Sequence, residues 1–288
     1  MSADAITQPP IQGFVRLSGP SAEVVKTLGP LADLLGTWVG SQGWNMIAVP
    51  INVNDKENFQ LEIMQVNETI TFSPIGAAVP NKGFPQPTFI FGLQYELRVC
   101  DLQTSQPLHI ENGMWLLLDQ NAQPGAPGTI ARQAAIPHGD SLLALGSYST
   151  TDGPPQIPDI NAVPDPGPDA PLGYTDPWTI PLAGFSKVNP NQVLQDFILD
   201  QEIIQTTTLD VSTENNGGIV NIPFLTHNVH PSAFQSTFWI EKVVDQATGQ
   251  VFEQLQYSQQ TNLHFIHKFG APGLIMWPHV NINTLVKQ

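Results

Sequence analysis

The sequence predicts an all-β fold: an antiparallel up-and-down β-barrel with a proline-rich insertion and one short helix. Three observations favour this fold. Several segments alternate apolar and polar residues with period two, which is typical of half-buried strands. Short turn sequences separate these segments. The composition is rich in turn formers, with 27 Pro and 23 Gly, and little of the chain shows a helical period.

The N-terminal part is expected to contribute little to the barrel wall. Residues 1–28 are predicted to be an irregular lead-in, with a short helical turn at SAEVVKTL. LADLLGTW predicts a second helical turn that ends at Gly36. A first strand follows, which carries Trp38, Gly40 and Trp44. Glycines inside a strand indicate a bend or a close backbone approach.

Period-two segments provide the predicted wall strands. The clearest are FIFGLQYELRV at 89–99 and VFEQLQYSQQTNLHF at 251–265. In FQLEIMQVNETITF at 59–72 the apolar residues change from odd to even positions within one segment. Such a change of face predicts a bulge or a strong bend, the device that curls a sheet into a barrel.

Successive hairpins favour a meander over a parallel sheet. DLQTSQP connects the 89–99 strand to LHIENGMWLLL, and DQATGQ connects STFWIEKVV to the 251–265 strand. Neighbouring strands joined by such short turns run antiparallel.

One region interrupts this pattern. Residues 151–190 hold 10 of the 27 prolines, which is typical of a long extended excursion. NPNQVLQDFILDQEI after it predicts the best helix, and TTTLDVST and GIVNIPF resume strand character. We interpret 151–235 as an insertion in a single barrel domain of 288 residues, in preference to an independent domain. Its role as a lid over the barrel mouth or as a dimer contact stays open, and so does a homodimer.

Charge and cysteine content exclude several classes of protein. The formal net charge is −15, which would repel nucleic acid and anionic membranes. The single cysteine, Cys100, excludes an internal disulfide. No apolar run is long enough to span a membrane, and the N-terminus lacks the pattern of a signal peptide. We therefore expect a soluble cytoplasmic protein.

The common catalytic motifs are absent. The chain has no GxSxG, no HExxH and no glycine-rich phosphate loop. HIE at 109–111 is only a fragment of a cupin-like metal motif.

Histidines provide the remaining candidates for chemistry. His109 is predicted on one face with Glu111 and Trp115, His138 at a rim turn, and His264 on a polar face. His227, His230 and His267 are interpreted as exposed or satisfied side chains. His279 lies in the closing strand, on one face with Ile275, Trp277 and Leu285. An imidazole among large apolar groups must find a partner or stay neutral, and a neutral imidazole in a dry cavity suits a haem iron.

Three stretches together resemble nitrobindin and its haem-binding β-barrel relatives. LLGTWVGSQGW at 34–44 is similar to that family's opening strand, PLHIENGMWLLL at 107–118 to an inner strand, and WPHVNINTLVK at 277–287 to its terminal Pro–His strand. IARQAAIPHGDSLLALG at 130–146 resembles a further strand–turn–strand of the family. The order of elements agrees over 29–147 and 236–287, and the 151–235 insertion has no counterpart in small nitrobindins.

The resemblance implies a barrel that binds haem b, with His279 as the proximal ligand to a ferric iron. It implies binding of NO, isomerisation of peroxynitrite, or weak peroxidase activity. His109 is the candidate on the distal side, with support through Glu111 as the alternative. The resemblance also implies further cofactor contacts, from Trp277, Trp38, Thr37, His138 and Met114.

Two other functions compete with haem binding. The first is a haem-free carrier of an apolar small molecule, with His279 as a polar anchor in the barrel cavity. The second is a non-haem metal enzyme that uses His109, Glu111 and His138. For a peroxidase, Arg98 or Arg132 would have to supply a charge-stabilising donor.

Overall fold

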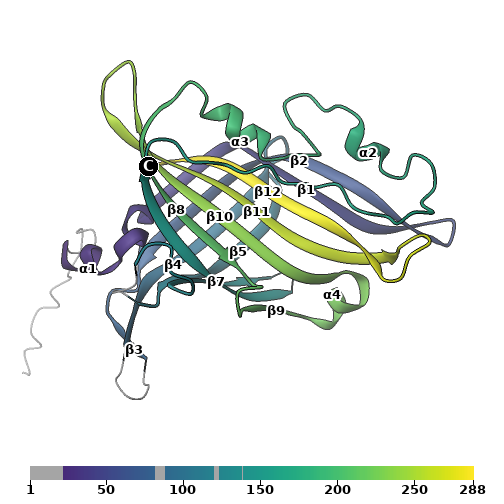
Figure 1. Cartoon of the computed structure of the whole chain (residues 1–288), viewed down its shortest axis with the longest axis horizontal. Coiled ribbons are helices and arrows are strands. Elements are labelled where there is room, and N and C mark those ends of the chain that lie inside the picture. The colour runs from purple at the N-terminus through teal and green to yellow at the C-terminus, as the bar shows by residue number, and fades with distance from the viewer. Residues whose placement is uncertain (1–21, 82–87, 120–122, 138) are drawn as a thin grey trace, which may run out of the picture.

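The computed structural model describes residues 22–81, 88–119, 123–137 and 139–288, which form a β-barrel (Figure 1). Short helical elements are few. They are α1 (Ala22–Thr27), η1 (Gly29–Leu34), α2 (Asp176–Thr179), α3 (Gln192–Phe197) and α4 (Pro223–Asn228). The strands of the first half are β1 (Gly36–Val53), β2 (Lys56–Pro74), β3 (Val79–Asn81), β4 (Thr88–Asp101), β5 (Pro107–Leu117), β6 (Ile130–Ile136) and β7 (Asp140–Asp152). Those of the second half are β8 (Glu202–Ser212), β9 (Gly218–Asn221), β10 (His230–Val244), β11 (Val251–His267) and β12 (Leu274–Lys287).

The wall is a closed antiparallel meander, which confirms the predicted fold class. Its order is β2-β1-β12-β11-β10-β8-β7-β6-β5-β4, and pairing of β2 with β4 closes the ring. The short strands β3 and β9 lie outside this ring and pair with β4 and β7. Because first and last strands of the chain pair through β1 and β12, the closing strand lies beside the opening one.

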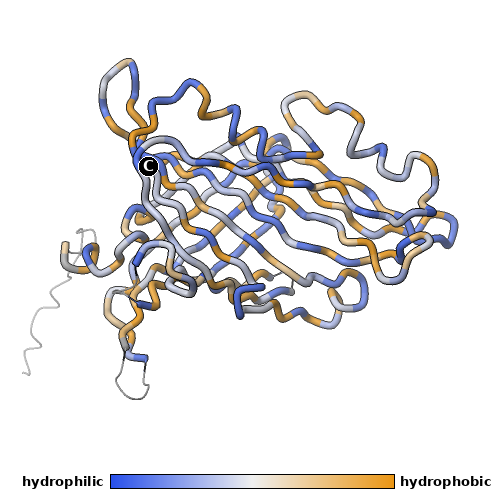
Figure 2. The backbone as a smooth tube through the Cα atoms, in the orientation of Figure 1, coloured by the Kyte–Doolittle hydropathy of each residue, from blue (hydrophilic) through white to orange (hydrophobic). Residues whose placement is uncertain are grey.

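Alternating side chains fill the barrel, and the alternation is visible along the wall strands in Figure 2. One end is plugged by Leu31 and Leu34 of η1, both fully buried. Trp38 at the start of β1 donates from Nε1 to the Leu34 carbonyl at 2.7 Å, which attaches the plug to the wall. The helical turns predicted near SAEVVKTL and before Gly36 are thus confirmed as α1 and η1. Residues 1–21 of the predicted lead-in lie outside the described residues.

The change of face predicted to mark a bulge in 59–72 has another cause. A bulge does interrupt the pairing of β2 with β1, opposite Val66 and Glu68, but its extra residue lies in β1, between Gly40 and Gly43. Even-numbered residues such as Val66 and Ile70 belong to the barrel core. Phe59, Leu61 and Ile63 pack instead with a second apolar cluster, outside the barrel core. Apolar residues therefore occur on both faces of β2. Its outer face is covered by the second apolar cluster in the first half of the strand, and its inner face faces the barrel core in the second half.

The insertion predicted at 151–235 is narrower than expected. β8 pairs with both β7 and β10 and is a wall strand, as are the first residues of β10. Only 153–201, which we call the strap, departs from the wall before β9 and α4 make a second, shorter excursion. Within the strap, the predicted helix is reduced to the six residues of α3.

The strap lies along the outside of the wall as a covering layer (Figure 1). Its Ala162, Trp178, Phe185 and Leu194 are buried in the second apolar cluster. Backbone pairing of β1 with β12 ends at Met46 and Val280, although β1 continues to Val53. Beyond that point Trp178 contacts Phe59 of β2 and Trp277 of β12, at ring-centroid distances of 5.3 and 5.8 Å. An aromatic side chain of the strap thus bridges the β1–β2 hairpin and the β11–β12 hairpin beyond the point where β1 and β12 stop pairing.

Asn191 fixes the strap to β11, which gives a first prediction. This fully buried side chain donates to the Pro158 carbonyl at 2.8 Å and accepts from Ser258 Oγ at 2.7 Å. We expect Asn191→Ala to lower the free energy of unfolding by about 1–3 kcal/mol, because it leaves buried polar partners unsatisfied. Chemical denaturation measures the change. Asn52→Ala, at an exposed position in β1, serves as the matched control and should have no measurable effect; equal stabilities of the two variants would contradict the anchor.

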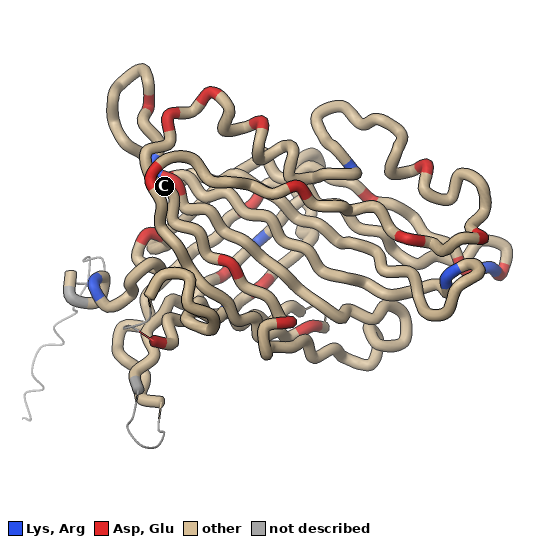
Figure 3. Tube along the Cα trace, in the orientation of Figure 1, with Lys and Arg blue, Asp and Glu red and all other residues tan. Residues whose placement is uncertain are grey.

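Among the described residues, no helix is both long and apolar enough to cross a lipid bilayer. Figure 3 shows acidic residues scattered over strands and loops, with few basic residues among them.

Candidate functional site

A cavity of about 260 Å³ opens inside the barrel at the end opposite the η1 plug. We call it the mouth cavity. Its wall is mostly apolar, and β9 and α4 contribute to its rim. The apolar residues that line it are Ile47, Ala48, Val49, Pro50, Ile136, Leu142, Ile219, Leu225, Val229, Pro231, Phe234 and Leu263. Its polar lining residues are His109, Asp140, Gln259, Thr261, His279 and Asn281, with no Lys or Arg in the described part of the lining.

Two histidines face this cavity from across the barrel. His279 belongs to β12 and His109 to β5, and these strands are separated by three wall strands one way around the ring and five the other. His279 Nε2 lies 2.8 Å from Oδ1 of Asn45 on the paired strand β1. Because an amide oxygen accepts, this bond has the imidazole as its donor, and it fixes the ring orientation. The structure therefore brings His109 and His279 into one recess.

The cavity floor is a buried polar network centred on Arg132 of β6. Its guanidinium donates to Glu111 Oε1 at 2.8 Å, to the Tyr95 hydroxyl at 3.1 Å and to Ser236 Oγ at 3.0 Å. A fourth bond, at 2.9 Å, reaches Oε1 of the lining residue Gln259. Arg132 is 1% exposed, so nearly every donor it has must be satisfied within the protein.

Glu111 connects this network to the cavity wall. Its Oε2 lies 3.1 Å from His109 Nε2, and its Oε1 also accepts a short bond from the Tyr95 hydroxyl. Burial alone would raise the pKa of Glu111, but the Arg132 charge and the bonds from His109 and Tyr95 lower that pKa to about 2. Gly113 makes room for this arrangement, since a Cβ there would collide with the Tyr95 ring and the Gln133 carbonyl. The floor is therefore an ion pair with no free charge facing the cavity.

A second buried carboxylate, Glu68, lies on the inner face of β2. Its Oε2 accepts from Tyr257 at 2.6 Å and from Asn283 at 2.8 Å, while Oε1 has no partner among the described residues. Burial raises the pKa of Glu68 to about 7, although the two hydrogen bonds oppose the shift.

Asp140 at the start of β7 is the one carboxylate among the described lining residues. Its Oδ1 is buried and accepts no hydrogen bond within the described chain. Burial raises the pKa of Asp140, and the nearby His109 partly offsets the rise.

Other residues predicted to hold a cofactor lie away from the mouth cavity. Trp38 is in the core beside η1, and Thr37 faces outward, within 3.1 Å of Thr71 Oγ1. Trp277 is fully buried against Phe59, Phe265 and strap residues. Met114 is 40% exposed on the outer wall, because even-numbered residues of β5 point away from Glu111 and Trp115. His138 lies outside the described residues.

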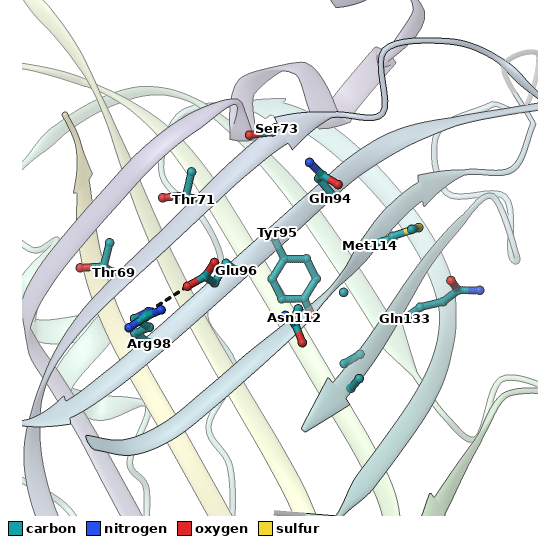
Figure 4. Close-up of a pocket in the computed structure, with 13 residues that line it drawn as sticks. Thr69, Thr71, Ser73, Gln94, Tyr95, Glu96, Arg98, Asn112, Met114 and Gln133 are labelled. Carbon is teal, nitrogen blue, oxygen red and sulfur yellow. Dashed lines mark hydrogen bonds and ion pairs between the residues drawn. The ribbon is translucent and has the colours of Figure 1, made fainter. Parts of the chain in front are cut away.

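A second depression, about 850 Å³, is an open groove on the outer face of β2, β4, β5 and β6. Figure 4 shows its lining, which includes Thr69, Thr71, Gln94 and Met114, and the ion pair between Glu96 and Arg98. It is open to solvent and has no buried charge within the described lining, so it is a weaker candidate for a ligand site than the mouth cavity.

Sequence reasoning found both cavity histidines but missed the floor. Arg132 and Arg98 were equal candidates for a charged donor near the site. Arg132 is inside, and Arg98 is exposed and paired with Glu96 at 2.8 Å. The alternation of inward and outward side chains along each strand distinguishes the two arginines. Arg132 shares the buried face of Ile130 and Ala134, whereas Arg98 lies on the face opposite Leu97 and Val99. Among the described residues, no group of three or more His, Cys, Asp or Glu is placed to hold a metal ion.

Comparisons with known proteins leave the family open. No protein-family model matches the chain, and no curated protein matches it significantly. A solved structure, the crystal structure of Rv2717c from M. tuberculosis, is similar over 93% of this chain and 98% of its own, with 17% identity and a TM-score of 0.45. The assignment of the described residues to a closed ten-strand antiparallel barrel with an internal mouth cavity rests on the structure of the chain itself.

Proposed function

We propose that the protein binds haem b at the mouth cavity, with His279 as the iron ligand. The observation that carries the proposal is that His279 lines a mostly apolar recess at the open end of the barrel. A haem iron takes a neutral imidazole as axial ligand and is protected by apolar walls. The resemblance of WPHVNINTLVK to the closing strand of haem-binding barrels supports the same residue.

The side chains present fit the chemistry of haem and limit its position. His279 supplies the nitrogen donor, and Ile47, Val49 and Leu263 supply apolar walls. The volume of about 260 Å³ is below the roughly 300–1,000 Å³ usual for sites of drug-sized ligands. The cavity as it stands would therefore not enclose a whole porphyrin.

In this proposal the chain's own residues bind, orient and exclude water. A bound haem would supply an iron that takes up small ligands such as NO, peroxynitrite or peroxide. Asn45 holds the His279 ring through its 2.8 Å bond, the type of outer partner that tunes an iron ligand. His109, oriented by Glu111, faces the same recess and could donate to or accept from a small ligand there.

A specific observation favours a second function, the haem-free carrier. The mouth cavity is small and mostly apolar, and its floor carries a neutralised ion pair. A compact, mostly apolar molecule would be enclosed whole in such a cavity. Here His279 and His109 would only offer hydrogen bonds.

An absorption titration with hemin tests haem binding. We expect one equivalent of hemin to produce a sharp Soret band, and we expect His279→Ala to abolish it, because the iron loses its only ligand from the chain in this proposal. His267→Ala removes an exposed imidazole from β11 and is the matched control.

Competition between hemin and a neutral apolar dye distinguishes the two proposed functions. N-phenyl-1-naphthylamine should fluoresce in the cavity under either proposal, but only the haem proposal predicts that hemin displaces it with 1:1 stoichiometry. Dye binding without a Soret band, unchanged in His279→Ala, would reject haem and support the carrier.

A further inference from the structure

Three potential metal ligands lie in one row on the outside of the barrel. His230 of β10 is directly opposite His264 of β11, and His264 is directly opposite Met276 of β12. Directly opposed residues in antiparallel strands point to the same side, with Cβ atoms about 4.5–5.5 Å apart. The row faces outward, because Leu263, the neighbour of His264, lines the mouth cavity inside.

The two imidazoles are close and accessible. Their ring centroids are 6.4 Å apart and the ring planes are inclined at 55°. His230 is exposed, whereas His264 and Met276 are half-buried. His264 Nε2 lies 2.8 Å from Ser232 Oγ, which holds this ring in place.

We propose that His230, His264 and Met276 bind a monovalent copper ion on the outer wall beside the barrel mouth. Thioether sulfur selects Cu(I) among the metals common in proteins, and imidazole suits copper in either oxidation state. The three residues include no carboxylate, so hard cations such as Mg²⁺ or Ca²⁺ have no suitable ligand in this row. The site is distinct from the mouth cavity and independent of haem binding.

Competition with the chromophoric chelator bicinchoninate, under anaerobic reducing conditions, tests the site in the full chain. Cys100 is half-buried and could bind Cu(I) by itself, so all variants carry Cys100→Ser. We expect this background to withdraw one equivalent of Cu(I) from the chelator. His230→Ala, His264→Ala and Met276→Leu should each weaken binding by at least the roughly tenfold loss that removal of an outer-shell partner causes.

Two comparisons separate this site from nonspecific binding. His267→Ala, at an exposed histidine on the same strand, should leave the Cu(I) affinity unchanged. Met276→Leu should weaken Cu(I) binding but not Zn²⁺ binding, since zinc gains little from a thioether. Thermal unfolding without copper checks that each variant is folded. Undiminished Cu(I) affinity in His264→Ala or in Met276→Leu, or tighter binding of Zn²⁺ than of Cu(I), would overturn the proposal.

Discussion

Arg132→Met is expected to lower the free energy of unfolding by about 3–5 kcal/mol, the cost of leaving one partner of a buried ion pair without the other. Glu111 is fully buried and would then have to take up a proton or remain charged in an apolar interior. The Tyr95 hydroxyl, Ser236 and Gln259 would each lose a donor as well. Urea denaturation at neutral pH measures the difference.

Arg98→Met provides a matched control for this prediction. Arg98 is on β4, which β5 separates from the β6 of Arg132, and it forms an ion pair with Glu96, but its side chain is 66% exposed. Exposed pairs contribute roughly 0–1 kcal/mol, so this variant should be close to wild type. Similar losses for Arg98→Met and Arg132→Met would show that the buried network does not have the energetic role assigned to it.

The double variant Glu111→Gln/Arg132→Met separates the ion pair from packing. The amide introduced by Glu111→Gln would keep an acceptor for Tyr95 without a buried charge, so the double variant should recover a large part of the loss caused by Arg132→Met alone. The same variants test the floor of the mouth cavity, because His109 and Gln259 are oriented by Glu111 and Arg132. We expect weaker binding of any cavity ligand in Arg132→Met even where the protein remains folded.

The barrel was predictable because its signals are local. Period-two alternation and short turns such as DQATGQ specify antiparallel neighbours, and they required no knowledge of distant contacts. The position of β8 was obscured because Thr206 and Thr207 are buried polar residues, so TTTLDVST alternates only weakly. The bulge predicted within β2 has a related explanation. The strap covers part of the outer face of β2, so apolar residues occur on that face as well as on the inner face.

The candidate site was predictable only in part. Parity within β5 and β12 placed His109 and His279 inward, and the structure places both at the mouth cavity. Trp277 shares a motif with His279, and Trp38 occurs in another motif of the same resemblance, but motif membership does not give distance along the barrel axis. Trp38 is at the plugged end, and Trp277 packs under the strap. The coupling of Glu68 to Asn283 joins residues far apart in the chain, which periodicity cannot reveal.

Stability is expected to fall as the pH rises from about 4.5 to about 8, because two buried carboxyl groups hold protons that the unfolded chain has lost. Glu68 has a pKa raised to about 7. Burial raises the pKa of Glu241 to about 8, although a 2.6 Å bond from Gln254 opposes the shift. A raised folded-state pKa stabilises the protein fully below the unfolded value, and this contribution is lost as the pH rises through the folded value.

At acid pH the dependence has the opposite sign, because the free energy of unfolding is expected to fall as the pH is lowered. The pKa of Glu111 is lowered to about 2, so its contribution is present above the unfolded value of 4.5 and is lost as the pH falls toward 2. These three groups together place the highest stability near pH 4.5–5, lower than the neutral optimum that ordinary surface carboxylates would give. Urea denaturation at intervals from pH 3 to pH 9 measures the profile.

Glu241→Gln isolates one of these groups. An amide mimics the protonated carboxyl in shape and keeps an oxygen to accept from Gln254. We expect the free energy of unfolding of the variant to match that of wild type at pH 4 and to exceed it at pH 9, by roughly 5 kcal/mol. Glu214→Gln, at an exposed position between β8 and β9, should leave the profile unchanged. If Glu241→Gln were no more stable than wild type at pH 9, burial would not be holding a proton on Glu241, and the fall in stability above pH 7 would need another group.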